Sequence, residues 1–300
     1  MFINENATRT STMVGRKRQQ KTWKCWQMRL ITRLIQIYLA KPYFYKINRF
    51  LFLHSLNGIG IFNYENNKVS GEQWLIRKLA KIGSLSMVID VGSNEGSYID
   101  LLLENNPTSV IFAIEAHPIT YKRLEAKYSD SRNVTTLNMA VSDEKGIVDI
   151  FDYGNCEGGS QHASLYKDVI VDIHCSKQEP KKYSVQMLTL DEIMFSANIG
   201  AVKEVDLLKI DTEGHEKAVL LGALKTIKKY NVKYIHFEFN EMNVVSKTTF
   251  YEFTKILEGY RLFRLLPCGL IPLDPYVPIL CELYGYQNIL AIKKGETILK

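Results

Sequence analysis

A short apolar run that ends in an acid and a glycine, at residues 87–96, constrains this chain more than any other stretch. Its sequence is MVIDVGSNEG, and an amphipathic segment follows the second glycine. This pattern predicts a buried strand, a tight turn and the start of a helix. Gly92 lets the backbone turn sharply, and Gly96 lets the helix pack close to the strand. Because ligands bind at the carboxyl ends of strands in open α/β sheets, the turn predicts a ligand site.

The composition of this turn favours one cofactor class over another. A dinucleotide site is expected to show G-x-G-x-x-G, whereas the two glycines here are spaced G-x-x-x-G. Asp90 and Glu95 place negative charge beside the turn, which repels phosphate. S-adenosylmethionine (SAM) carries a sulfonium and an ammonium group and no phosphate. The turn therefore favours SAM, and the alternative is a βα turn of some other α/β protein.

A second apolar strand is predicted at residues 110–115, and it ends in Glu115. An acid at the tip of the neighbouring strand, about 20 residues after the glycine turn, accepts hydrogen bonds from ribose hydroxyls. Two carboxylate oxygens match two vicinal hydroxyl groups. We therefore expect Glu115 to hold the ribose, and the alternative is a solvated glutamate at a strand end.

Helices and strands alternate along most of the remaining chain, which predicts an α/β fold. We expect a mostly parallel seven-stranded sheet with helices on both faces. Its strands are predicted at 87–91, 110–115, 134–139, 205–210, 232–239, 260–266 and 288–292. Two further strands, 146–153 and 183–190, flank a long polar loop at 154–182, which is expected to cover the substrate. A single helix is predicted over 214–230.

Acidic groups follow the predicted strand at 205–210, where the cofactor should lie. Asp211, Glu213 and His215 stand in the stretch KIDTEGHE, and Glu238 ends the next strand. Methyl transfer to a hydroxyl needs a group that takes the hydroxyl proton, and a carboxylate or histidine can do this. The alternatives are that the acids stabilise the positive end of a helix dipole and that His215 is simply solvated.

A divalent cation could instead lower the pKa of the hydroxyl group. Asp211, Glu238 and Asn240 would supply the hard oxygen ligands that magnesium prefers. The sequence leaves this metal route and direct proton transfer open.

Positive charge is concentrated in the N-terminal region, although the whole chain carries a net charge of +6. Residues 1–50 hold 11 Lys and Arg residues and one acid, Glu5, so the rest of the chain is mildly acidic. We expect a disordered basic tail at 1–22, a helical arm at 23–70 and a catalytic domain at 71–300. Residues 23–56 are interpreted as a basic amphipathic segment on an anionic membrane or as a helical cap. Nucleic-acid binding is not expected.

Five scattered cysteines without a C-x-x-C motif indicate neither a disulfide framework nor a zinc site. They fit a reducing cytoplasm. The expected location is therefore cytoplasmic, with peripheral contact to the inner face of the membrane if the arm binds lipid.

These motifs resemble the FkbM family of SAM-dependent methyltransferases over roughly residues 71–294. The resemblance rests on Glu72, DVGSNEGSY at 90–98, EAHP at 115–118, NMAVS at 138–142, TLD at 189–191, KIDTEGHE at 209–216 and Glu238. It implies a class I methyltransferase fold and O-methylation of hydroxyls on sugars or polyketide-type natural products. The acceptor could also be a lipid-linked glycan. Two departures, Ser93 where the family usually has a smaller residue and His117 where it often has Pro, are mild.

The resemblance also implies roles for individual residues. Asp90, Gly92, Asn94 and Gly96 would shape the SAM turn, Glu115 would hold the ribose, and Asn138 and Ala140 would lie near the adenine. Asp211, Glu213 and Glu238 would face the acceptor, with His215 as a further candidate base.

Two other function classes remain to be compared with this prediction. One is an NAD(P)-dependent oxidoreductase on a similar sheet, which the missing middle glycine and the acids at the turn disfavour. The other is a non-catalytic binding module that has retained the fold. Titration with SAM and NAD would separate a methyltransferase from an oxidoreductase. Turnover of SAM to S-adenosylhomocysteine would exclude a non-catalytic binding module.

Overall fold

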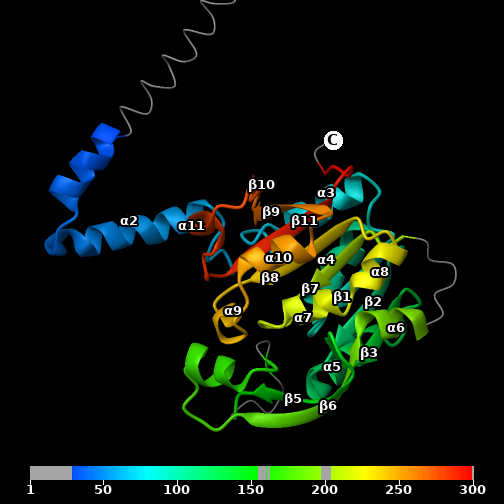
Figure 1. Ribbon diagram of the computed structural model, residues 1–300. Coiled ribbons are helices and arrows are strands. Elements are labelled where there is room, and N and C mark those ends of the chain that lie inside the picture. Colours follow the sequence, from blue (N-terminus) through cyan, green and yellow to red (C-terminus); the bar gives the residue numbers. More distant parts are fainter. Residues whose placement is uncertain (1–28, 155–159, 161–162, 197–203, 299–300) are drawn as a thin grey trace, which may run out of the picture. The chain divides into compact units, whose positions relative to one another are not determined.

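A computed structural model describes residues 29–154, 160, 163–196 and 204–298 of the chain (Figure 1). The tail predicted to be disordered, residues 1–22, lies outside the described residues. The chain divides into two compact units, residues 1–58 and 59–300. The predicted boundary lies at residue 71, whereas residues 59–70 group with the larger unit here. Within that unit the Phe62 amide donates a hydrogen bond of 2.8 Å to the carbonyl of Tyr286.

The smaller unit is helical in its described part, which agrees with the predicted arm. Residues 29–34 are helical and continue as the π-helix η1, Ile35–Leu39. A short 3-10 helix η2, Pro42–Phe44, leads into helix α2, Tyr45–Gly58. In the part of the chain that the structure describes, no helix combines the length and apolar character needed to cross a membrane.

The larger unit is organised around a sheet of eight strands in the order β10-β9-β11-β8-β7-β1-β2-β3. The strands are β1 Met87–Val91, β2 Val110–Glu115, β3 Val134–Asn138, β7 Leu207–Ile210, β8 Tyr234–Phe239, β9 Tyr260–Leu266, β10 Gly269–Pro272 and β11 Gln287–Lys293. Strands β8, β7, β1, β2 and β3 run parallel to one another. Strands β11, β9 and β10 pair antiparallel, as predicted for the closing pair.

All seven predicted strands form, and the sheet gains an eighth, β10. This strand pairs only with β9 and is four residues long. It ends at Pro272, a residue that strands tolerate only at an edge or end. The four residues of β10, GLIP, are mostly apolar but show no clear strand pattern. For this reason no strand was predicted here from the sequence.

Strand β1 lies at the centre of the parallel part, and all five of its residues are buried. A run that is apolar on both faces is expected where helices cover a sheet on both sides. Helices α3 Glu72–Lys81, α4 Ser97–Asn105 and α5 Pro118–Tyr128 pack on one face through Leu75, Ile99 and Leu124. On the other face lie α6 Leu190–Ser196, α7 Glu216–Leu221 and α10 Phe250–Ile256, packed through Ile193, Val219 and Phe253.

A second, three-stranded sheet has the order β4-β6-β5, with β4 Ala140–Ser142, β5 Gly146–Asp152 and β6 Lys181–Thr189. Figure 1 shows β5 and β6 in green, apart from the large sheet. A single residue, Met139, separates the end of β3 from the start of β4. The chain therefore leaves the large sheet at the carboxyl end of β3. This connection brings the second sheet to the edge where the ligand site is predicted.

The single helix predicted over 214–230 is wrong, because the structure has two helices there. Helix α7 ends at Leu221, and α8 spans Leu224–Lys229. Between them, Gly222 accepts a hydrogen bond of 2.9 Å from the amide of Asp191. A Cβ atom on Gly222 would lie 1.9 Å from the carbonyl oxygen of Ser142 in β4. The break therefore lets the chain approach β4 more closely than a continuous helix with side chains allows.

We expect Gly92→Ala to destabilise the protein much more than Gly83→Ala. Both glycines have positive φ, +78° and +73°, which costs about 1–2 kcal/mol for alanine. A Cβ atom on Gly92 would also lie 1.7 Å from the Asp211 carbonyl oxygen, whereas Gly83 has open space around it. Urea unfolding should therefore show a loss of more than about 3 kcal/mol for Gly92→Ala only. Equal losses would mean that the close contact between the β1 turn and β7 is unimportant.

Candidate active site

Three cavities meet at the carboxyl ends of β1, β2, β7 and β8. The first cavity has about 670 Å³ of empty space and includes Glu115 in its wall. The second has about 1080 Å³ and includes Glu72, and the third has about 1030 Å³ and includes Asn240. Asn94 and Asp211 line all three cavities. These two side chains therefore mark the point where the cavities join.

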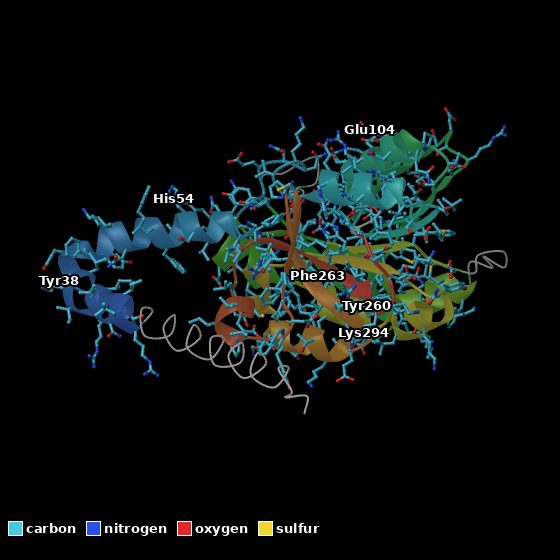
Figure 2. The ribbon with its side chains drawn as sticks, turned by 90° about the horizontal axis from the view of Figure 1, so that it is seen from above. Tyr38, His54, Glu104, Tyr260, Phe263 and Lys294 are labelled. Carbon is cyan, nitrogen blue, oxygen red and sulfur yellow. The ribbon has the colours of Figure 1, made fainter. Side chains whose placement is uncertain are left out.

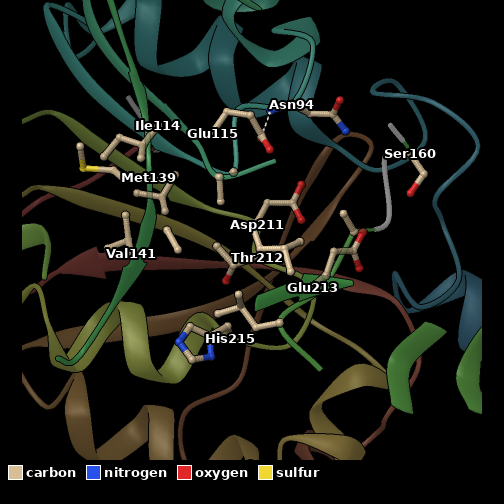
Figure 3. Close-up of a pocket in the computed structure, with 17 residues that line it drawn as sticks. Asn94, Ile114, Glu115, Met139, Val141, Ser160, Asp211, Thr212, Glu213 and His215 are labelled. Carbon is tan, nitrogen blue, oxygen red and sulfur yellow. Dashed lines mark hydrogen bonds between the residues drawn. The ribbon is translucent and has the colours of Figure 1, made fainter. Parts of the chain in front are cut away.

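Glu115 lines the first cavity, whose wall combines polar and apolar side chains (Figure 3). Its Oε2 accepts a hydrogen bond of 2.8 Å from the Asn94 amide, and its Oε1 accepts one of 2.7 Å from the His117 amide. Burial raises the pKa of Glu115 to about 7, although these two amides act in the opposite direction. The apolar part of the wall consists of Val91, Ile114, Ala116, Met139, Ala140, Val141, Ile150, Ala163 and Leu165.

The predicted turn residues occupy the junction between β1 and α4. The amide of Gly92 donates to the carbonyl of Ile114 at 2.9 Å, which ties the turn to β2. Gly92 and Asn94 line the first cavity, and the buried Oδ1 of Asn94 has no hydrogen-bond partner among the described residues. Gly96 precedes α4 with φ +82°, where a Cβ atom would collide with Tyr128. It therefore shapes the helix start and lies outside the lining of the three cavities.

Asp90 lies beneath the turn and also outside the cavity lining. It is fully buried in β1, and its Oδ1 is 3.5 Å from the Nζ atom of Lys209. Lys209 donates further hydrogen bonds of 3.1 Å to the carbonyl of Gly92 and to Oδ2 of Asp211. Burial alone would lower the pKa of Lys209, but the carboxylates of Asp211 and Asp90 raise it above its usual value. This buried cation links the turn to the tip of β7.

The two residues predicted near the adenine differ in their positions. Ala140 lines the first cavity. Asn138 does not, and its Nδ2 donates hydrogen bonds to the carbonyls of Glu115 at 2.9 Å and Ala116 at 3.1 Å. Asn138 therefore holds the end of β3 against the end of β2.

Glu238 lies near the end of β8, Asn240 follows the strand directly, and both line the third cavity. Burial raises the pKa of Glu238 well above its usual value, and the charges of Asp211 and Glu213 raise it further. Asn240 donates a hydrogen bond of 3.2 Å to Oε2 of Glu238, and its own Oδ1 accepts one of 3.0 Å from the Met242 amide. Glu238 therefore holds its proton more tightly than an exposed glutamate does.

The magnesium site predicted at Asp211, Glu238 and Asn240 is not supported by the described residues. Among the described residues, no group of three or more His, Cys, Asp or Glu side chains is placed to hold a metal ion. The side-chain oxygen of Asn240 already accepts a backbone hydrogen bond.

His215 lies in the wall of the first cavity, together with Glu213 (Figure 3). Its Nε2 lies 2.9 Å from Oγ of Ser142, and its Nδ1 lies 3.0 Å from the hydroxyl of Tyr166. Burial lowers the pKa of His215 to about 4, so the ring is neutral at physiological pH. His215 is therefore not simply solvated, because both of its ring nitrogens have side-chain partners.

Several residues that line the cavities were not predicted from the sequence. Ser160, Ala163 and Leu165 come from the long polar loop, which was expected to cover a ligand, although no residue in it was named. Tyr64 and Tyr286 line the second and third cavities, and their rings meet edge to face at 5.9 Å. Tyr64 precedes the predicted domain boundary, so no signal in the sequence pointed to it.

A mostly parallel sheet, a glycine turn after its central strand and a carboxylate at the tip of the neighbouring strand agree with the fold predicted for a SAM-dependent methyltransferase. The Methyltransferase FkbM domain family matches residues 90–262, which is more than half of the chain. The chain therefore belongs to the FkbM methyltransferase family.

Individual relatives are distant. The 2-O-methyltransferase NoeI of Sinorhizobium fredii is 23% identical over 163 residues, which cover 53% of this chain and 65% of the relative. The methyltransferase FkbM of Methylobacillus flagellatus is 12% identical with a TM-score of 0.41, over 69% of this chain and 44% of that one. The O-methyltransferase of Bacillus cereus, solved in complex with SAH, is 11% identical with a TM-score of 0.42, over 87% of this chain and 96% of that one.

The residues of the first and second cavities fit SAM. The two oxygens of Glu115 each accept one backbone hydrogen bond and keep a further lone pair for a hydroxyl group. Asn94 presents a buried acceptor without a partner among the described residues. The first cavity has no Lys or Arg among its described lining residues, so it offers no cation to a pyrophosphate.

Proposed function

We propose that this protein transfers the methyl group of SAM to a hydroxyl group of a sugar or another polyhydroxylated acceptor. The position of Asp211 carries the proposal, because its carboxylate lines all three cavities. A base at this junction lies beside both the cofactor and the acceptor. When bound, SAM supplies an electrophilic methyl group on a positively charged sulfur.

The first and second cavities would hold the cofactor. Glu115 would accept hydrogen bonds from both ribose hydroxyls, and the apolar wall that contains Met139, Ala140 and Val141 would enclose the adenine. In the second cavity, Glu72 is the acid at the start of α3, and its side chain accepts a hydrogen bond of 3.0 Å from Ser70. A carboxylate there suits the ammonium group of the methionine part.

SAM affinity is expected to rise between about pH 6 and about pH 8. The pKa of Glu115 is raised to about 7, so its carboxyl group is mostly protonated at the lower pH and mostly ionised at the higher one. Only the ionised form can accept two ribose hydroxyls in addition to two backbone amides. Binding near pH 7 should therefore release a proton, which calorimetry in buffers of different ionisation enthalpy measures. The same proton release in Glu115→Gln would assign it to the amino group of SAM instead.

The third cavity would receive the acceptor. It combines the aromatic rings of Tyr64 and Tyr286 with the polar groups of Glu238 and Asn240, and none of its described lining residues is Lys or Arg. Aromatic rings pack against the apolar face of a sugar, and the carboxyl and amide groups bond its hydroxyls. An acceptor without negative charge suits this wall best, because Asp211 and other acids would repel an anion.

The acceptor hydroxyl loses its proton as the new oxygen–carbon bond forms and the sulfur–carbon bond breaks. Asp211 would accept this proton, and the hydrogen bond from Lys209 holds its carboxylate in position. Glu238, which lines the third cavity, would form a hydrogen bond with the acceptor. Glu213 and His215 stay predicted as alternative bases, although the ring nitrogens of His215 already have partners.

Mass spectrometry of glycans incubated with the protein and SAM tests this proposal. We expect neutral oligosaccharides to gain the mass of one CH₂ group per transfer, together with an equal amount of S-adenosylhomocysteine. The matched control is the Asp211→Asn variant with the same acceptors. Methylation only of anionic acceptors or of amines, or no turnover of SAM with any hydroxyl compound, would contradict the proposal.

A further inference from the structure

The arm, residues 29–58, presents apolar side chains on all sides of its helices. Helix α2 has Tyr45, Ile47, Phe50, Leu51, Phe52 and Leu53 exposed, and these positions point in different directions around a helix of 3.6 residues per turn. Figure 2 shows the arm's side chains, with Tyr38 and His54 labelled, projecting around its helical segments. The exposed large apolar residues of the arm are Leu30, Ile31, Leu34, Ile35, Ile37, Tyr38, Tyr43, Tyr45, Ile47, Phe50, Leu51, Phe52 and Leu53.

The arm exposes more apolar side chains than a helix that packs on a protein core normally does. A surface helix shows one apolar stripe, whereas a helix that is apolar all round is normally buried. The side chains of Ile37, Tyr43 and Phe50 are 58%, 69% and 57% exposed. The arm therefore exposes more apolar surface than a single apolar stripe accounts for.

The charge of the arm restricts what can cover it. No Asp or Glu occurs between Asn6 and Tyr64. Five basic residues, Arg29, Arg33, Lys41, Lys46 and Arg49, are spread along the described part of the arm, and all are exposed. Two copies of such an arm would repel each other, which disfavours a dimer through this surface. A covering surface that is both apolar and negatively charged fits these residues.

We propose that the arm lies in the headgroup region of an anionic lipid membrane. Its apolar side chains would enter the acyl boundary from α2 and from the preceding helix. Lys and Arg side chains would extend towards lipid phosphates, and the tyrosines would sit at the interface. The 14 residues of α2 span about 21 Å, so this helix by itself is shorter than the hydrocarbon core of about 30 Å.

This inference does not depend on the proposed function, because it uses only residues of the smaller unit. If both hold, the catalytic unit is tethered close to the membrane, where the predicted lipid-linked acceptors are found. The cytoplasmic location predicted from the cysteines would present a leaflet that contains anionic lipids.

Co-sedimentation of the full-length protein with vesicles tests the inference. We expect binding to vesicles of phosphatidylcholine mixed with phosphatidylglycerol and little binding to phosphatidylcholine alone. The double variant Lys46→Glu and Arg49→Glu should bind the mixed vesicles at least about tenfold more weakly. Each basic residue near such a surface contributes about fivefold to the affinity. Raising the salt concentration should weaken binding in the same direction.

The matched control carries Lys225→Glu and Lys228→Glu, two exposed lysines of the larger unit. This control changes the net charge by the same amount and should bind as the parent does. Equal losses in both double variants, or equal binding to neutral and mixed vesicles, would overturn the inference. The inference would also be overturned by two results together: the full-length protein binds no vesicles, and the amides of α2 are protected from hydrogen exchange. Such protection would show that protein covers the arm.

Discussion

Asp211→Asn is expected to lower the turnover number at least about 100-fold while the dissociation constant for SAM changes little. The substitution keeps the size of the side chain and removes the charge that would accept the acceptor's proton. A general base contributes about 10²–10⁴ in rate. Initial rates of S-adenosylhomocysteine formation with saturating acceptor measure the first quantity, and calorimetry measures the second.

Asp149→Asn is the matched control, because Asp149 also pairs with a lysine, Lys182 at 2.8 Å, but lines none of the three cavities. It should turn over as fast as the parent protein. EDTA should have no effect if Asp211 acts directly, whereas loss of activity that magnesium restores would assign a metal to Asp211 and Glu238. If Asp211→Asn turns over at the parent rate, the acids only stabilise the start of α7 and the catalytic role is wrong.

Glu115→Gln is expected to weaken SAM binding about 10- to 150-fold, which corresponds to about 1.5–3 kcal/mol for hydrogen bonds to a charged group. Glutamine keeps the shape but loses the charge and places a donor where an acceptor is needed. Because the substitution also disturbs the hydrogen bonds from Asn94 and His117, it needs a control that removes an equivalent carboxylate elsewhere.

Glu282 provides that control, since its carboxylate accepts backbone hydrogen bonds from Phe250 at 2.8 Å and Tyr251 at 2.9 Å. It lines none of the three cavities in the described residues. Glu282→Gln should lose some stability and bind SAM as the parent does. Equal SAM affinity in folded Glu115→Gln and Glu282→Gln would remove Glu115 from the cofactor site.

Much of the site could be predicted because a parallel sheet brings distant residues to one edge. The turn after β1, the acid at the end of β2 and the acid after β7 are separated by many residues in the chain. In the structure, Gly92, Asn94, Glu115, Ala140 and Asp211 line one cavity. Gly92, Glu115 and Asp211 end or follow apolar runs, so these strand ends were predicted from the sequence, whereas Ala140 was predicted from the family resemblance only.

The features that could not be predicted depend on contacts between segments without such a pattern. Tyr64 and Tyr286 meet only because residues 59–70 pack within the larger unit. Gly222 ends α7 because of its close approach to Ser142, which a helical pattern does not show. Likewise, Ile150 and Leu165 enter the first cavity through the position of the second sheet, which no local periodicity determines.

A crystal structure of the protein with bound S-adenosylhomocysteine tests the central claim most directly. We expect the nucleoside in the first cavity, with both ribose hydroxyls within about 3 Å of the Glu115 carboxylate oxygens. The sulfur atom should face Asp211, at the junction with the third cavity. Binding of the nucleoside outside the first cavity, or a ribose that makes no contact with Glu115, would contradict the account.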